Sequence, residues 1–179
     1  MPYPPPVRFE ALFPRLEARV ESYGVDVDLL DFDPPFTGDL TGDQVLIDPD
    51  ESAESKCFLV LHLFGHLVQW NVHPDLIDEI GVTAVPVGEE KIAAVERYEL
   101  EACRYGAGLL AKEPDGEDFA QWFADYAACD LAYLAHYYRT AEKRPFEEFW
   151  QEGSGAVEPL AVPEFTPKRF RDGRAGVVL

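Results

Sequence analysis

The stretch CFLVLHLFGHLVQW, residues 57–70, is the most apolar part of the 179-residue chain, and the rest of the fold has to be built around it. Its length fits a buried helix that ends before Pro74, which disfavours helix at His73. His62 and His66 lie inside it, four positions apart. On a helix this spacing puts both imidazoles on one face, where they can reach one tetrahedral ion. A pair of core histidines bonded to backbone or carboxylates is the alternative interpretation.

Before this stretch, the sequence predicts a helix and then a small sheet. Residues 7–24 are amphipathic, and Gly24 ends the pattern. Residues 25–32 alternate briefly, as strand residues do. The segment that follows is rich in turn residues and predicts a short strand over residues 44–47.

The helix that carries the histidines is expected to start at the sequence DPDE. In this prediction Asp48 is the N-cap, Pro49 the first helical residue and Glu51 the reciprocal cap. The helix should run to residue 70 or 71, and residues 74–88 are expected to form a loop.

Two further helices are predicted over residues 89–113 and 117–143, followed by a short turn over residues 144–151. The order of helix, small sheet and then helices indicates the α+β class, with a small antiparallel sheet packed on a mainly helical body. We expect a single domain over residues 1–152 and an extended C-terminal tail over residues 153–179.

The composition limits the classes of partner. The 15 basic and 34 acidic residues give a net charge of -19, which repels nucleic acid and anionic lipid and suits solubility or a cationic partner. The three cysteines predict no disulfide framework, as expected in a reducing cytoplasm. No secretion signal is recognised at the start, and the longest apolar run is too short to span a membrane.

A carboxylate interrupts the apolar stripe of the helix predicted over residues 89–113. Glu99 occupies a stripe position, with Cys103 and Leu110 beside the stripe; its other members are Ile92, Val95, Ala102, Gly106 and Leu109. A buried carboxylate needs a cation or a metal as partner. Arg97, Arg104 and a buried histidine are ordinary candidates. Together, His62, His66 and Glu99 would form a His₂Glu set, which is a ligand pattern of catalytic zinc.

At this point the chain resembles the ImmA/IrrE-type zinc metallopeptidases. Members have a small sheet, a helix with H-E-x-x-H and a helix reading roughly E-x-E-A-N-x-F-A-x-x-L-L. The corresponding segments here are GDQVLIDPDESAESKCFLVLHLFGH and ELEACRYGAGLL, within residues 38–115. The resemblance implies a zincin-like fold in which His62, His66 and Glu99 hold zinc.

The sequence departs from this family at two positions. The catalytic Glu that follows the first histidine in the family is Leu63 here, and leucine cannot deprotonate a metal-bound water. The frequent Asn of the second motif is Cys103, which suggests a thiol near the metal. Glu96 and Glu101 are the nearby carboxylates that could replace the base.

Two other histidines are weaker candidates as ligands. His73 follows His66 by seven positions, which on a continuous helix places it about 10 Å further along the same face. His136 lies among aromatic residues, and a core or surface role is expected for it.

Three functional hypotheses follow. The first, which we favour, is a metallopeptidase-like protein without hydrolytic activity that acts by protein binding, with zinc as its possible cofactor. The second is an active zinc metallopeptidase with a different base, and the third is a structural domain with a buried histidine and glutamate network. The resemblance implies a basic DNA-binding regulatory protein as partner, which an acidic surface would attract. The basic tail residues between Lys168 and Arg174 could instead lie across the acidic face.

Overall fold

The structure is a computed structural model, and it describes residues 3–75 and 85–172. The elements follow the order α1 (Pro6–Glu21), β1 (Asp26–Leu29), β2 (Gly38–Leu40), β3 (Gln44–Ile47), α2 (Ala53–Val72), α4 (Glu89–Leu110), the 3₁₀ turn η1 (Gly116–Phe119), α5 (Ala120–Thr140) and the 3₁₀ turn η2 (Phe146–Phe149). The α+β class is confirmed. Most of the predicted loop over residues 74–88, and Arg174 of the basic tail, lie outside the described residues.

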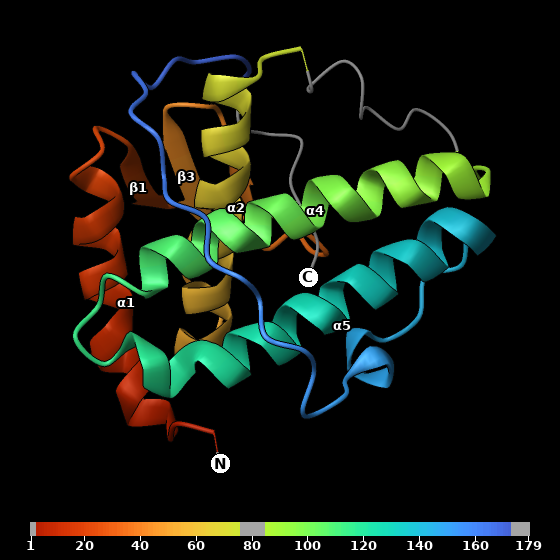
Figure 1. Cartoon of the computed structure of the whole chain (residues 1–179), viewed down its shortest axis with the longest axis horizontal. Helices are drawn as coiled ribbons and strands as arrows, with labels where there is room; N and C mark the ends of the chain where they lie inside the picture. Colours follow the sequence, from red (N-terminus) through yellow and green to blue (C-terminus); the bar gives the residue numbers. More distant parts are fainter. Residues whose placement is uncertain (1–2, 76–84, 173–179) are drawn as a thin grey trace.

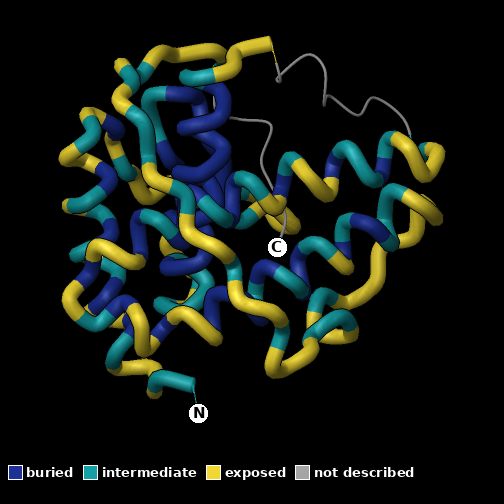
Figure 2. The backbone as a smooth tube through the Cα atoms, viewed as in Figure 1, coloured by how far each residue is buried: buried dark blue, intermediate teal, exposed yellow. Residues whose placement is uncertain are grey.

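Helix α2 is the centre of the core. Every residue from 57 to 70 is buried, while the surrounding helices each keep an exposed face (Figure 2). Helices α1 and α4 and the sheet all pack against it (Figure 1). The helix predicted from the apolar stretch is therefore confirmed, and it ends at Val72.

The predicted start of α2 was wrong. Ser52 is the N-cap, and its hydroxyl accepts a hydrogen bond from the Ser55 backbone N–H. The Asp48 carboxylate accepts bonds from the backbone N–H groups of Phe32 and Asp50 instead. Asp48 therefore stabilises the turn before the helix, since an Asp side chain can cap a turn as readily as a helix.

The sheet is mixed, not antiparallel as expected. Its strand order is β1-β3-β2, with β1 parallel to β3 and β2 antiparallel to β3. The strand over residues 44–47 was predicted, but residues 38–40 were taken for a turn. Parallel pairing needs a long connection, and residues 30–43 provide it while also supplying β2.

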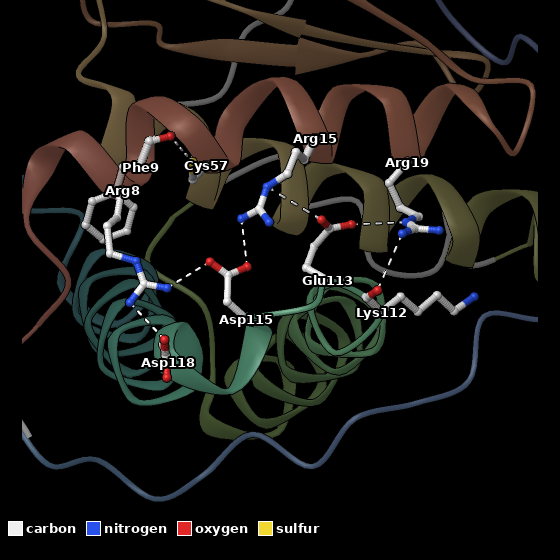
Figure 3. Close-up of polar contacts among 9 residues, drawn as sticks. All are labelled: Arg8, Phe9, Arg15, Arg19, Cys57, Lys112, Glu113, Asp115 and Asp118. Atoms are coloured by element: carbon white, nitrogen blue, oxygen red, sulfur yellow. Dashed lines mark hydrogen bonds and ion pairs between the residues drawn. The ribbon is translucent and has the colours of Figure 1, made fainter.

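Buried and half-buried ion pairs attach α1 to the turn after α4 (Figure 3). Glu113 is 6% exposed and pairs with Arg15 and Arg19 of α1. Asp115 pairs with Arg8 and Arg15. The apolar face predicted for α1 is confirmed, and its buried residues are Phe9, Leu12, Leu16 and Val20.

Two glycines let the α2 and α4 backbones touch. A Cβ atom on Gly65 of α2 would lie 2.0 Å from the Ala102 carbonyl oxygen of α4. A Cβ atom on Gly106 of α4 would lie 2.6 Å from the Leu61 carbonyl oxygen of α2. Gly106, a member of the predicted stripe, thus lies where α4 packs closely on α2. Gly65 stands between His62 and His66 in sequence, so this contact sets the distance from both histidines to α4.

The chain after η2 is extended from residue 154 to residue 170, as predicted, and it crosses the outside of α4 (Figure 1). The Leu160 N–H donates to the Arg104 carbonyl, and a Cβ atom on Gly108 would lie 1.9 Å from the Leu160 carbonyl oxygen. Gly108 thus makes room for the tail and not for another helix. Further on, Arg169 pairs with Asp43 and Arg171 with Asp39, so these two basic residues contact acidic residues of the sheet region.

Two smaller expectations concern the cysteines and the membrane. Cys57, Cys103 and Cys129 are all free and buried, as the absence of a disulfide framework predicts. Within the described ranges, no helix combines the length and the apolar character needed to cross a membrane.

We predict that Gly65→Ala lowers the free energy of unfolding by about 1–3 kcal/mol, because the added methyl group overlaps the Ala102 carbonyl of the neighbouring helix. Urea denaturation followed by circular dichroism measures the change. Gly155→Ala is the matched control, since nothing lies within 4 Å of a Cβ atom there, and it should stay within about 0.5 kcal/mol. Equal stability of the two variants would contradict the backbone contact.

Candidate metal centre

Three buried side chains from two helices converge on one point. His66 Nε2 lies 3.1 Å from His62 Nε2 and 2.8 Å from Glu99 Oε2, and His62 Nε2 lies 3.3 Å from Glu99 Oε2. These residues are 6–9% exposed. The structure therefore brings together the three residues that the sequence singled out. We call them the His/Glu cluster.

Gln69 fixes which nitrogen of His66 faces the cluster. The Gln69 side-chain amide donates to the Tyr98 carbonyl at 2.9 Å and to the Glu101 carboxylate at 2.7 Å. Its oxygen therefore faces His66 Nδ1 at 2.9 Å, and because that oxygen only accepts, Nδ1 carries the proton. In neutral His66 the Nε2 lone pair then points at Glu99. This is the tautomer that a metal-binding histidine needs.

His62 is held by contacts of a different kind. Its Nδ1 lies 3.4 Å from the Cys103 sulfur, and its ring stacks on Phe58. The thiol expected near the metal is thus beside the ring nitrogen that faces away from the cluster. Cys103 positions His62 here and is not one of the converging ligand atoms.

The buried position of the His/Glu cluster and the contacts among its members determine the charge states of Glu99 and His62. Burial opposes ionisation of Glu99, but the His66 and His62 imidazoles outweigh it and hold the pKa of that carboxyl well below its usual range. Burial likewise opposes charging of His62, yet contacts with Cys103, Glu99 and Asp130 raise the pKa of His62 above its ordinary value. The carboxylate form of Glu99 thus requires a positive charge beside it, supplied by protons on the imidazoles or by a metal ion.

Asp130 of α5 is a fourth residue that the sequence reasoning missed. It is 2% exposed, and its Oδ2 lies 3.8 Å from His62 Nε2. Burial and the charge of Glu99 raise the pKa of Asp130 to about 7, although His62 opposes the shift. The same signal that marked Glu99 was present here, since Asp130 interrupts an apolar helix face that includes Trp122, Phe123 and Ala127.

The remaining candidates lie elsewhere. Leu63 is 1% exposed and packs toward Gly38 of β2, inside the core. Glu101 binds Gln69, and Glu96 is exposed. His73 is an exposed residue at the end of α2, and His136 packs on Phe149, so neither belongs to the cluster.

The geometry of the His/Glu cluster suits one ion. Ligands about 2.0–2.1 Å from a tetrahedral zinc ion are separated from one another by roughly 3.3–3.4 Å. The separation of His62 from Glu99, 3.3 Å, matches that value, while those of His66 from His62 and from Glu99, 3.1 and 2.8 Å, are hydrogen-bond distances that an ion would have to widen. The same atoms can also share protons in a hydrogen-bonded network when no ion is bound.

Comparison with known proteins leaves function to be inferred from this site. No protein-family model, curated protein or solved structure matches the chain.

Proposed function

We propose that this chain is a metallopeptidase-like protein that holds one zinc ion on His62, His66 and Glu99 and acts by binding another protein, without ordinary peptidase activity. The observation that carries the metal assignment is the convergence of three buried ligand atoms, with Gln69 holding His66 in the tautomer that presents Nε2. Two imidazoles and a carboxylate are donors that zinc accepts.

The loss of peptidase activity follows from Leu63. In the metallopeptidases that the chain resembles, a Glu beside the first histidine takes a proton from the metal-bound water. Here that position is an aliphatic residue packed in the core, and Glu101 is already bonded to Gln69. A bound ion would polarise what it touches, but this chain offers no glutamate at the position of the family base.

Binding of another protein is the function that remains for a metallopeptidase-like fold without a catalytic base. The net charge of -19 favours a basic partner, and the resemblance suggests a DNA-binding regulatory protein. The same charge disfavours direct binding of nucleic acid and anionic membranes.

The metal proposal predicts one zinc ion per chain in tag-free protein after zinc loading and gel filtration, measured by inductively coupled plasma mass spectrometry. His62→Ala, His66→Ala and Glu99→Gln should each weaken zinc binding by more than about 100-fold, beyond the 10–100-fold typical of an outer-shell partner. His73→Ala and His136→Ala are matched controls and should bind as the parent does. A correctly folded parent that retains no zinc would indicate a purely hydrogen-bonded network.

The peptidase proposal predicts no chelator-sensitive cleavage of unfolded casein or a mixed peptide library by the zinc-loaded protein. Loss of general acid–base catalysis typically costs 10²–10⁴-fold, which takes a peptidase to background. Leu63→Glu is the complementary variant, tested after its fold is confirmed because Leu63 belongs to the core. Robust cleavage by the unmodified chain, abolished by a chelator, would contradict this prediction.

The partner proposal predicts that a purified basic helix-turn-helix repressor binds the protein and that affinity falls markedly between 50 and 500 mM salt. Exposed charges are screened over about 8–10 Å near physiological salt, which weakens attraction between the two surfaces. Biolayer interferometry measures both this and the absence of binding to free DNA. Binding that does not respond to salt would remove the electrostatic basis of the proposal.

A further inference from the structure

One oxygen of the buried Asp130 carboxylate lacks a hydrogen-bond partner in residues 3–75 and 85–172. Its Oδ2 has no hydrogen-bond donor among the described residues, and the side chain is 2% exposed. The residue lies within α5, where the backbone N–H groups are already used by the helix. Within the described part of the chain, His62 is the one cationic residue at ion-pair distance.

The Asp130 carboxylate lies beside the His/Glu cluster. Its Oδ2 lies 3.8 Å from His62 Nε2, which is the nitrogen that faces Glu99. The separation is longer than a hydrogen bond, and the side chains whose ligand atoms all lie within 4.8 Å of one another are those of His62, His66 and Glu99 without Asp130. Ligation by Asp130 therefore requires its side chain to turn toward the cluster when an ion binds, and χ2 of an aspartate is a broad torsion.

We propose that Asp130 is the fourth protein ligand of the metal ion, so that the site is a closed His₂GluAsp centre contributed by α2, α4 and α5. This inference rests on the proposed function, because it assumes that an ion binds at His62, His66 and Glu99. An ion there gives the Asp130 carboxylate a direct positive partner, whereas the His62 ring alone lies 3.8 Å from its Oδ2.

A fourth protein ligand changes what the metal does. Catalytic zinc keeps one position open for water or substrate, whereas structural zinc has four protein ligands. With Asp130 bound, no position remains for a substrate carbonyl. The centre then ties α5 to the α2–α4 pair. The closed coordination shell and the absence of a base at Leu63 would each prevent peptide hydrolysis.

Cobalt substitution tests this directly. The tag-free full chain is loaded with Co²⁺, its visible spectrum is recorded, and acetohydroxamate is added as a probe for an open coordination position. The parent should give a four-coordinate spectrum that the hydroxamate leaves unchanged. Asp130→Ala should give a spectrum that shifts with hydroxamate, and Asp130→Asn, which keeps the side-chain shape, should bind Co²⁺ more than about 100-fold more weakly, beyond an outer-shell effect.

Two controls separate ligation from folding and from outer-shell effects. Asp125→Asn alters a buried aspartate of the same helix that contacts Tyr3, Gly153 and Ser154, and it should bind Co²⁺ as the parent does. Cys103→Ser changes the contact with His62 Nδ1, the nitrogen that faces away from the cluster. The affinity for Co²⁺ should therefore fall 100-fold or less, and the spectrum should not respond to hydroxamate. Circular dichroism confirms that each variant is folded.

The outcomes are distinct. A parent whose cobalt spectrum shifts with hydroxamate has an open position, which would overturn the inference while leaving the metal proposal intact. Asp130 variants that bind Co²⁺ with the affinity and spectrum of the parent would also overturn it. A folded parent that takes up neither cobalt nor zinc refutes the proposed metal function and the inference together.

Discussion

The backbone contact between α2 and α4 is the constraint on which the site depends. Gly65 and Gly106 leave room for the facing carbonyls of Ala102 and Leu61, and no larger residue fits at either position without a shift. On α2 the contact involves Leu61, just before His62, and Gly65, just before His66, and on α4 it lies within two turns of Glu99. Imidazole and carboxylate groups are too short to meet across a wider gap, so the approach of the two backbones determines whether the His/Glu cluster exists.

The close approach also creates an electrostatic problem that the rest of the centre has to solve. It brings acceptor atoms of His62, His66 and Glu99 within about one ligand separation of each other, with Asp130 beside them. Because the Gln69 oxygen accepts from Nδ1 of His66, a neutral His66 cannot carry its proton on Nε2 and donate it to Glu99. Protons can balance this charge, but they are shared among several acceptors. A divalent cation bound at His62, His66 and Glu99 would balance their charge with one ion, which is why we favour a metal as the occupant.

Much of this arrangement was predictable from sequence, because apolar periodicity reports burial along a helix. It predicted the helix over residues 57–70, the buried stripe of α4 and the position of Glu99 within it. It could not predict sheet topology, since the pairing of β1 with β3 depends on distant residues and not on local pattern. The prediction of Asp48 as the N-cap of α2 was wrong because an aspartate stabilises turns as well as helix starts. Asp130 was missed although its signal matched that of Glu99, since no motif directed attention to α5.

Zinc K-edge X-ray absorption on the tag-free, zinc-loaded protein tests the central claim most directly, because it reports the atoms bound to the ion. The account predicts four nitrogen and oxygen ligands near 2.0–2.1 Å, with the outer scattering of two imidazoles and no sulfur. A zinc–sulfur distance near 2.3 Å would place Cys103 in the coordination shell, and scattering from one imidazole or none would remove His62 or His66. Either result would contradict the centre described here.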